Sequence, residues 1–300
     1  MNAGYTKEDV SAAFREIQTS ICLGLEAIDG GEHFSRDEWQ HHDGGGGLSR
    51  ILTHGRVFEK GGVNFSAVEG RLPEFMKTRV NASATHFFAT GVSLVMHPHS
   101  PLVPIVHANI RYFQTNAGDA WFGGGIDLTP IYVNVPQGKH FHQTLKATCD
   151  AHGADYYDRF KREADDYFFI PHRKETRGIG GIFFDYLSDK PNDRLVFDFV
   201  KAVGHTFINA YGPIAEENKA LPYTEDQKKW QWIRRGRYVE FNLVYDRGTR
   251  FGLETGGRIE SILMSLPEHA SWFYNHQPHE QSPEAESSKY YNKGIDWVNL

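Results

Sequence analysis

Cysteine is scarce in this chain and long apolar runs are absent, and both absences narrow what the protein can be. Cys22 and Cys149 are the only cysteines among 300 residues, too few for a disulfide framework or for an iron–sulfur cluster, which generally takes four thiolates. No apolar stretch approaches the roughly 20 residues of a membrane-spanning helix. The first residues lack the features of a signal or transit peptide. We therefore expect a cytoplasmic protein with no transmembrane segment.

Motifs typical of cofactor and nucleotide enzymes are also missing. No Gly-x-Gly-x-x-Gly follows a predicted strand, and neither Gly-x-Ser-x-Gly nor His-Glu-x-x-His occurs. The run HHDGGGGLSRI (residues 41–51) lacks the Gly-Lys-Ser/Thr ending of a P-loop, so we interpret it as a flexible loop. If the protein is an enzyme, its chemistry has to use the substrate itself, a loosely held metal or dioxygen.

The overall composition is that of a globular protein. Hydrophobic residues make up 40% of the chain and charged residues 23%, which is ordinary for a protein that buries a sizeable core. The formal net charge is −6, and this acidic balance argues against a general role in nucleic-acid binding.

The order of the predicted elements favours a single α+β domain built on a mainly antiparallel sheet. Thr6 and Asp9 form a predicted capping box before apolar residues at helical spacing, and Gly30 and Gly31 end this first helix. No regular strand–helix–strand alternation follows. Further helices are predicted over residues 137–152, 154–169 and 193–219, with a short last helix after Ser282, and strands are predicted within 84–135, over 179–187 and over 237–251.

One predicted strand has an unusual polar face. In PIVHANIRYF (residues 104–113), His107, Asn109 and Arg111 stand at every second position. A strand places such residues on one face, each roughly 7 Å from the next. The apolar residues between them lie on the other face. An imidazole, an amide and a guanidinium in one row indicate a ligand-binding or catalytic surface.

Arginine is concentrated in one part of this acidic chain. Each arginine is interpreted equally well as part of a solvated face or a surface ion pair. Together they also suit a pocket for a polyanion, because a guanidinium binds a carboxylate through two parallel hydrogen bonds. The arginines lie at Arg234, Arg235, Arg237, Arg247, Arg250 and Arg258, and Arg111, Arg173 and Arg177 join them if the strands share a sheet.

Asp127 follows three glycines in WFGGGIDLTP. Glycine lets a ligand approach the backbone closely, which places this carboxylate well for binding or proton transfer. Thr129 and Pro130 equally suit an Asx-turn or a helix cap. The sequence leaves both interpretations open.

Histidine is frequent, with 16 residues, and two H-x-H pairs raise the question of a metal site. GVSLVMHPH matches the first half of the cupin signature, but the glutamate that should follow is replaced by the segment 101–104, PLVP. A single histidine on a strand is commonly a hydrogen-bonded structural residue or a general base. A divalent metal site therefore remains one interpretation, but the spacing of the histidines does not define its ligands.

Several long segments resemble one known family, the oxygen-dependent coproporphyrinogen III oxidases of haem biosynthesis. The segments follow one another in the same order from about residue 45 to the end of the chain. They are GVSLVMHP, PIVHANIRYF, WFGGGIDLTPIY, DDYFFIPHRKETRGIGGIFFDYL, RRGRYVEFNLVYDRGTRFGL and GGRIESILMSLP.

The resemblance implies one domain over residues 1–300, with the N-terminal helix in 1–35 and a region linked to dimerisation in 238–273. It implies a broad, mainly antiparallel sheet flanked by helices on both faces, and a homodimer. The implied activity is oxidative decarboxylation of two propionates of coproporphyrinogen III to vinyl groups, giving protoporphyrinogen IX. Dioxygen would be the co-substrate and electron acceptor, and no organic cofactor is expected.

The resemblance also assigns residues. His107 corresponds to a proton donor, Asp127 to the carboxylate that holds the pyrrole N–H groups, and Arg111 and Arg177 to arginines at the substrate. The substrate-binding positions are Ser93, Asn109, Ile110, Arg111, Gly256, Gly257 and Arg258. The positions sometimes assigned to a divalent metal are His97, His107, His142 and His172.

Two other functions remain open at this point. One is a metal-dependent oxidoreductase that uses the histidines, which would lose activity after exhaustive chelation. The other is a tetrapyrrole-binding protein without catalysis, which would bind a porphyrinogen and show no turnover in air.

Overall fold

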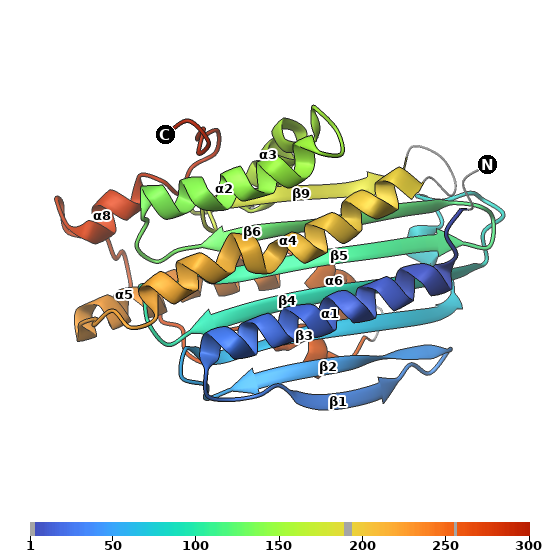
Figure 1. The fold of residues 1–300 in the computed structure, drawn as a ribbon, viewed down its shortest axis with the longest axis horizontal. Helices are drawn as coiled ribbons and strands as arrows, with labels where there is room; N and C mark the ends of the chain where they lie inside the picture. Colours follow the sequence, from blue (N-terminus) through green and yellow to red (C-terminus); the bar gives the residue numbers. More distant parts are fainter. Residues whose placement is uncertain (1–3, 189–193, 255–256) are drawn as a thin grey trace.

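The centre of the molecule is a seven-stranded antiparallel sheet (Figure 1). The computed structural model describes residues 4–188, 194–254 and 257–300. Six strands follow one another in chain order, and the seventh joins the edge after two helices, which confirms the predicted antiparallel α+β fold. The strands, in their order across the sheet, are β1 (Ser35–Gln40), β2 (Gly45–Thr53), β3 (Phe58–Arg71), β4 (His86–Pro98), β5 (Ile105–Thr115), β6 (Ala120–Thr129) and β9 (Gly180–Leu187).

Helices cover both faces of this sheet (Figure 1). On one face α1 and α4 cross the strands, and α2 and α3 lie toward β9; on the other face lie α5 to α7. The bounds are α1 (Lys7–Asp29), α2 (Val135–Asp150), α3 (Tyr156–Tyr167), α4 (Arg194–Asn218), α5 (Glu225–Val244), α6 (Arg247–Glu254), α7 (Ile259–Leu263) and α8 (Pro283–Ser288). A short 3-10 helix, η1 (Glu74–Met76), and a small sheet of β7 (Phe169–Ile170) and β8 (Glu175–Thr176) complete the described elements.

The main core lies between the sheet and the helices α1 and α4. The predicted capping box of α1 is present, because Thr6 and Asp9 exchange side-chain and backbone hydrogen bonds. Phe14 and Ile17 of α1 are fully buried, and Gly204 of α4 lies close to Ile17 and to Ile110 of β5. Each apolar side chain of this size contributes about 1.5–3 kcal/mol when it leaves water. This layer therefore supplies much of the stability of the fold.

The prediction of a loop over residues 41–51 was wrong for most of its length, because only residues 41–44 connect β1 to β2 and the rest belongs to β2. Gly45, Gly46 and Gly47 begin β2 and pair with β3, and Gly46 and Gly47 also pair with β1. A Cβ atom at Gly47 would overlap the carbonyl oxygen of Phe65 and the ring of Trp39. The glycines are therefore needed for close packing at the edge of the sheet.

The strand predicted over residues 237–251 is also wrong, because the segment forms the end of α5 and most of α6. Val239, Phe241 and Leu243 alternate like strand residues, but Leu243 is half exposed. Burial instead follows a helical spacing through Tyr238, Phe241 and Asn242. This helix covers the second face of the sheet, so the difference matters for the site.

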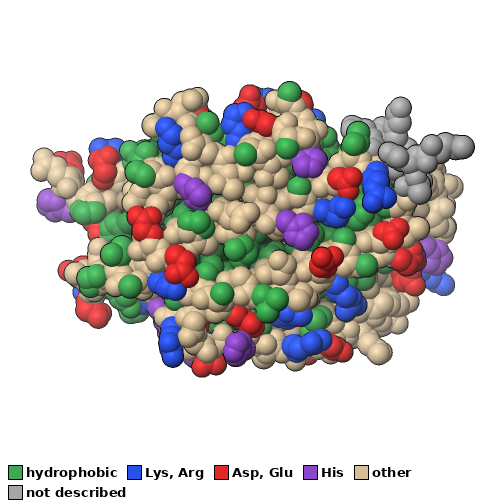
Figure 2. All heavy atoms as spheres, in the orientation of Figure 1, with side chains coloured by type: hydrophobic (Ala, Val, Ile, Leu, Met, Phe, Trp, Pro, Cys, Tyr) green, Lys and Arg blue, Asp and Glu red, His purple; other side chains and the backbone are tan. Residues whose placement is uncertain are grey.

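Charges of both signs are mixed on the face formed by α1 and α4. Figure 2 shows Lys and Arg interspersed with Asp and Glu, with no broad patch of one sign on the described part of this face. Among the helices of the described residues, none is long and apolar enough to span a membrane.

Candidate functional site

A pocket of about 470 Å³ lies between the second face of the sheet and the helices α5 to α7. Its volume falls in the range typical of small-molecule sites. The strands form its floor and the helices form its roof. The polar lining includes Asn64, Ser93, His107, Asn109, Arg111 and Arg177 beneath, Asn242, Asp246, Thr249, Arg258 and Ser261 above, and His41, His42, Asp43 and Arg71 at one end.

The register of the strands explains how the polar floor forms. His107 of β5 is opposite Asp127 of β6, and Asn109 is opposite Ser93 of β4. Arg111 is opposite Gly123. Side chains at every second position share a face, so His107, Asn109 and Arg111 line one pocket as their spacing predicted.

Asp127 is a fully buried carboxylate held by two partners. His107 lies 2.7 Å away through Nδ1, and Nη2 of Arg177 donates to both carboxylate oxygens at 2.8 and 2.9 Å. Burial opposes ionisation, but the charge of Arg177 and the hydrogen bond from His107 outweigh it, so the pKa of Asp127 lies below its ordinary value. An Asx-turn or a helix cap does not describe this residue, which lies within β6.

Arg177 lines the pocket and also holds Asp127. Its side chain is only 2% exposed, and Nη1 donates to Asn242 of α5 at 2.7 Å. The guanidinium also lies 4.5 to 4.7 Å from the ring centres of Phe168, Tyr238 and Phe241. These contacts fix the cation, and they fix the carboxylate beneath it.

Arg111 lies nearer the edge of the pocket and keeps about a third of its side chain exposed. Its Nη1 donates to Asn109 at 2.8 Å, and its Nη2 lies 3.0 Å from Asp185 of β9. The guanidinium rests against Gly123, where a Cβ atom would come within 2.6 to 2.8 Å of it. The triple glycine before Asp127 thus makes room for an arginine.

Asp246 was not among the predicted site residues, although it lies in the segment RRGRYVEFNLVYDRGTRFGL that carries the family resemblance. It lines the pocket and accepts hydrogen bonds from the hydroxyl of Tyr167 at 2.7 Å and the backbone N–H of Thr249 at 2.6 Å. Burial disfavours its charge, but these bonds hold the pKa of Asp246 below the ordinary value. The helical form of the segment brings this second carboxylate to the site.

Comparisons with known proteins place the chain in a family. A family model described as coproporphyrinogen III oxidase matches residues 9–297. A curated Drosophila melanogaster protein named oxygen-dependent coproporphyrinogen-III oxidase is 48% identical over 297 residues, which cover 94% of this chain and 76% of that protein. The chain belongs to the coproporphyrinogen III oxidase family. The resemblance seen in the sequence is therefore confirmed.

Not all residues assigned from the family share the pocket. The side chain of Ile110 lies on the opposite face, in the core against α1 and α4. Gly256 falls outside the described residues. Gly257 and Arg258 line the roof, and Arg258 contacts Asp37 of β1 through a charged hydrogen bond.

The four histidines that the sequence resemblance assigned to a metal lie apart, and of these only His107 lines the pocket. His97 is buried and bonds to the carbonyl of Ser265 at 2.9 Å, and burial lowers its pKa. His142 lies on α2, on the other face of the sheet, where burial lowers its pKa to about 3. His172 contacts Glu240 at the surface. Within the described ranges, no three His, Cys, Asp or Glu side chains are grouped to hold a metal ion.

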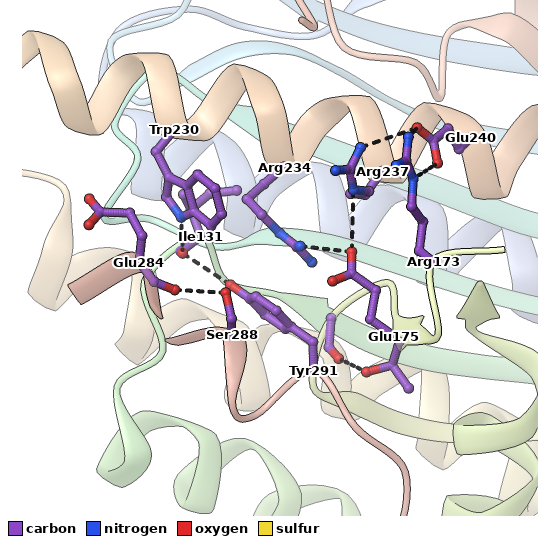
Figure 3. A network of polar contacts seen from close by, with 12 residues as sticks. Ile131, Arg173, Glu175, Trp230, Arg234, Arg237, Glu240, Glu284, Ser288 and Tyr291 are labelled. Carbon is purple, nitrogen blue, oxygen red and sulfur yellow. Dashed lines mark hydrogen bonds and ion pairs between the residues drawn. The ribbon is translucent and has the colours of Figure 1, made fainter. Parts of the chain in front are cut away.

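A polar network fixes α5 over the pocket in this family member (Figure 3). Arg234 of α5 lies 2.8 Å from Glu175 of β8, and Arg173 lies 2.6 Å from Glu240 of α5. Figure 3 shows Arg237 between the two carboxylates. In addition, Trp230 of α5 and Tyr291 both donate to the carbonyl of Ile131. The roof is thus tied to the β7–β8 turn and to the C-terminal segment.

Proposed function

We propose that this protein oxidatively decarboxylates two propionate side chains of coproporphyrinogen III to vinyl groups, giving protoporphyrinogen IX in haem biosynthesis. Dioxygen is the electron acceptor. Family membership supports this reaction. The single observation that carries it is the buried, ionised Asp127, which is held between His107 and Arg177, two residues that line a pocket with further arginines at its edge.

The chemistry sets three requirements for such a site. Conversion of a propionate carboxylate to a vinyl group releases carbon dioxide, one proton and two electrons. The site therefore has to bind carboxylates, accept a proton and admit dioxygen, which takes up the electrons. Porphyrinogens are electron-rich, so the substrate itself supplies the reducing equivalents without a flavin or nicotinamide.

Asp127 is suited to hold the pyrrole N–H groups. A carboxylate has about four acceptor positions on its two oxygens, and His107 and Arg177 occupy three of them. The position that remains accepts a hydrogen bond from an N–H donor. Because Asp127 carries a full charge in a buried setting, this bond is stronger than one between neutral groups.

His107 is suited to move the proton. Since Nδ1 of His107 donates its hydrogen to the ionised Asp127, the neutral imidazole has its in-plane lone pair on Nε2. Nε2 therefore accepts a proton, and the imidazolium that forms is stabilised by the same carboxylate. The protonated ring can then donate this proton from Nε2 to another group.

The arginines account for recognition of a tetra-acid by an acidic protein. Arg111 and Arg258 reach the pocket from opposite layers, the floor and the roof. Each guanidinium binds a carboxylate in a bidentate manner. Asn109 lies between His107 and Arg111 along β5, opposite Ser93 of β4, and both residues offer neutral hydrogen-bonding groups to the tetrapyrrole ring.

We further propose that neither an organic cofactor nor a divalent metal is needed.

We also propose a homodimer in which residues 238–273 take part. Large apolar side chains of this region are exposed in the single chain, which is unusual for a surface that faces only water. They are Leu243, Val244, Phe251, Leu253, Ile259, Trp272 and Phe273. Sedimentation of the protein with Trp272→Glu and Phe273→Glu tests this: the proposal expects monomers, and an unchanged dimer contradicts it.

A cytoplasmic location is proposed because both cysteines are free and buried, which suits a reducing compartment. Cell fractionation of the native protein tests this location directly. Recovery in an oxidising compartment contradicts it.

The activity is tested with coproporphyrinogen III in air and under nitrogen, with and without a strong chelator. Product is followed by protoporphyrin fluorescence after chemical oxidation. The proposal expects product only in air, with full activity after chelation. Loss of activity on chelation that added metal restores supports a metal-dependent oxidoreductase instead. Binding without product in air supports a tetrapyrrole-binding protein.

A further inference from the structure

Asp185 makes a contact with Arg111 that no family assignment explains. The carboxylate Oδ1 lies 3.0 Å from Nη2 of the guanidinium, and both side chains are partly buried. Asp185 does not itself line the pocket. It therefore touches the site only through the arginine.

The backbone around Asp185 is shaped so that this contact is possible. The pairing of β9 with β6 shifts by one residue opposite Gly123, which leaves a bulge at Asp185 and Tyr186. Tyr186 has a φ of 52°, in the left-handed region that non-glycine residues rarely adopt. Bulges of this kind change the direction of a side chain beside a site.

The bulge lets β9 direct Asp185 to the pocket face and Leu187 to the helix face. Phe183 faces the pocket and Phe184 faces the helices, so regular alternation directs Asp185 to the pocket face. If the alternation continued without a bulge, Leu187 would also face the pocket. With it, Leu187 joins the core on the helix face while Asp185 keeps its place beside Arg111.

Arg111 is held on three sides. Asn109 takes one N–H from Nη1, Asp185 faces Nη2, and Gly123 lies against the flat face of the guanidinium. A guanidinium has five N–H donors, so about three remain for another acceptor. A fixed guanidinium loses less side-chain entropy when it binds a ligand than a free one does.

We propose that Asp185 is a positioning residue that orients the guanidinium of Arg111 over Gly123, so that its remaining N–H groups meet a carboxylate of the substrate. This inference rests on the proposed function, in which Arg111 binds a carboxylate. It assigns to Asp185 an effect on affinity that is exerted entirely through Arg111.

The test is a double-mutant cycle with Asp185→Ala, Arg111→Ala and the combined variant. Affinity for coproporphyrinogen III is measured under nitrogen, where no electron acceptor is present, by quenching of tryptophan fluorescence. KM and kcat are then measured in air. We expect Asp185→Ala to weaken binding by about tenfold with kcat changed less than about twofold, and to have no effect once Arg111 is alanine.

Two further variants separate positioning from folding. Asp185→Asn keeps an acceptor oxygen and should lose less affinity than Asp185→Ala. Gly123→Ala moves the guanidinium from the other side, because the new methyl group meets only the far end of a flexible side chain. It should weaken binding while Asp185 stays intact. If Asp185→Ala does not fold, these two variants carry the test.

Glu163→Gln is the matched control. Glu163 lies close enough to Asp185 for their charges to interact, but its own ion pair is with Arg159. It should leave affinity unchanged. Losses from Asp185→Ala and Arg111→Ala that multiply in the double variant overturn the inference. An unchanged affinity in Arg111→Ala contradicts the proposed function itself, whereas a normal loss there with none in Asp185→Ala contradicts only the role of Asp185.

Discussion

His107 and Asp127 face each other across neighbouring strands, with Nδ1 of the imidazole 2.7 Å from Oδ1 of the carboxylate. The pairing comes from the strand register and needs no loop, so both groups are held by central strands of the main sheet. A geometry of this kind keeps the free ring nitrogen at a constant position.

Replacing His107 by alanine tests whether the imidazole moves a proton during the reaction. We expect kcat to fall by about 100-fold to 10,000-fold, the usual contribution of general acid–base catalysis. Substrate affinity under nitrogen should change little, because carboxylate binding depends on the arginines. Steady-state kinetics in air-saturated buffer provide the measurement, and a kcat within about tenfold of the parent contradicts the assignment.

The variant Asp127→Asn should destabilise the fold as well as abolish activity. It leaves the charge of Arg177, which is 2% exposed, without its counter-ion. Removing one partner of a buried ion pair typically costs about 3–5 kcal/mol. Urea unfolding measures this loss. The control Asp150→Asn breaks an exposed pair with Lys146 and should cost less than about 1 kcal/mol.

A companion variant separates stability from chemistry. Combining Asp127→Asn with Arg177→Met removes both charges, and the methionine keeps the aromatic contacts of the buried site. Stability should recover by about 1–4 kcal/mol relative to Asp127→Asn, because no uncompensated charge remains. Activity should not return. Recovery of activity would show that the carboxylate is only structural.

Glu240 makes part of the stability depend on pH. Its carboxyl loses solvent, which opposes ionisation, but hydrogen bonds from Arg173, His172 and Trp272 lower its pKa from 4.5 to about 2. A pKa lowered on folding stabilises the protein above the unfolded value, and this contribution disappears as the pH falls from about 4.5 toward 2. The upper limit of the effect is about 3 kcal/mol.

The free energy of unfolding in urea, measured from neutral pH down to about 3, tests this dependence. Glu240→Gln should be less stable than the parent at neutral pH and should lose less stability on acidification. Glu254→Gln, in an exposed pair with Arg250, is the control and should follow the parent curve. Parallel curves for Glu240→Gln and the parent would disprove the role of this carboxylate.

The glycine run in β2 gives a prediction about the end of the pocket. Gly47→Ala places a methyl group against the ring of Trp39, which lines the pocket, and against the backbone of Phe65. We expect a loss of about 1–3 kcal/mol, as for other overpacked sites. Gly212→Ala in α4 meets only ordinary contacts and should stabilise by about 0.5–1 kcal/mol. Thermal unfolding compares the two, and equal effects contradict the packing argument.

The central strands could be predicted from the sequence because local alternation reports local structure. Over residues 106–112 of β5, polar and apolar residues alternate, so the face occupied by His107, Asn109 and Arg111 follows from the pleat alone. The helix ends at Thr6 and Ser282 were likewise visible, since a side-chain cap acts within three residues.

Helix α5 could not be recognised in the same way, because its buried face mixes polar and charged residues with apolar ones. Gln231, Arg234, Arg235 and Asn242 are buried where an ordinary amphipathic helix has apolar residues, and Val244 is exposed. The buried charges are paired with residues far away in the sequence, such as Glu59 and Glu175. Local hydrophobic periodicity carries no signal of such pairs.

The residues that support the site could not be predicted for the same reason. Asp185 and Asp246 act through contacts with Arg111 and Tyr167 that cross 74 and 79 residues of chain, and only the sheet and the helix cover bring these groups together. The histidines show the converse. Their frequency suggested a shared ion, but the four candidate ligands each bond to different neighbours. These histidines are His97, His107, His142 and His172.

The positions of the elements along the chain have a consequence for biosynthesis. All seven strands of the main sheet, and the helices that bury its first face, lie before residue 219, whereas the helices above the pocket begin at residue 225. The ribosome therefore synthesises the sheet and the helices of its first face before the helices that form the roof of the pocket. Since domains can begin to fold during synthesis, a nascent chain can gain its shape before it gains a place where a reduced tetrapyrrole could meet oxygen.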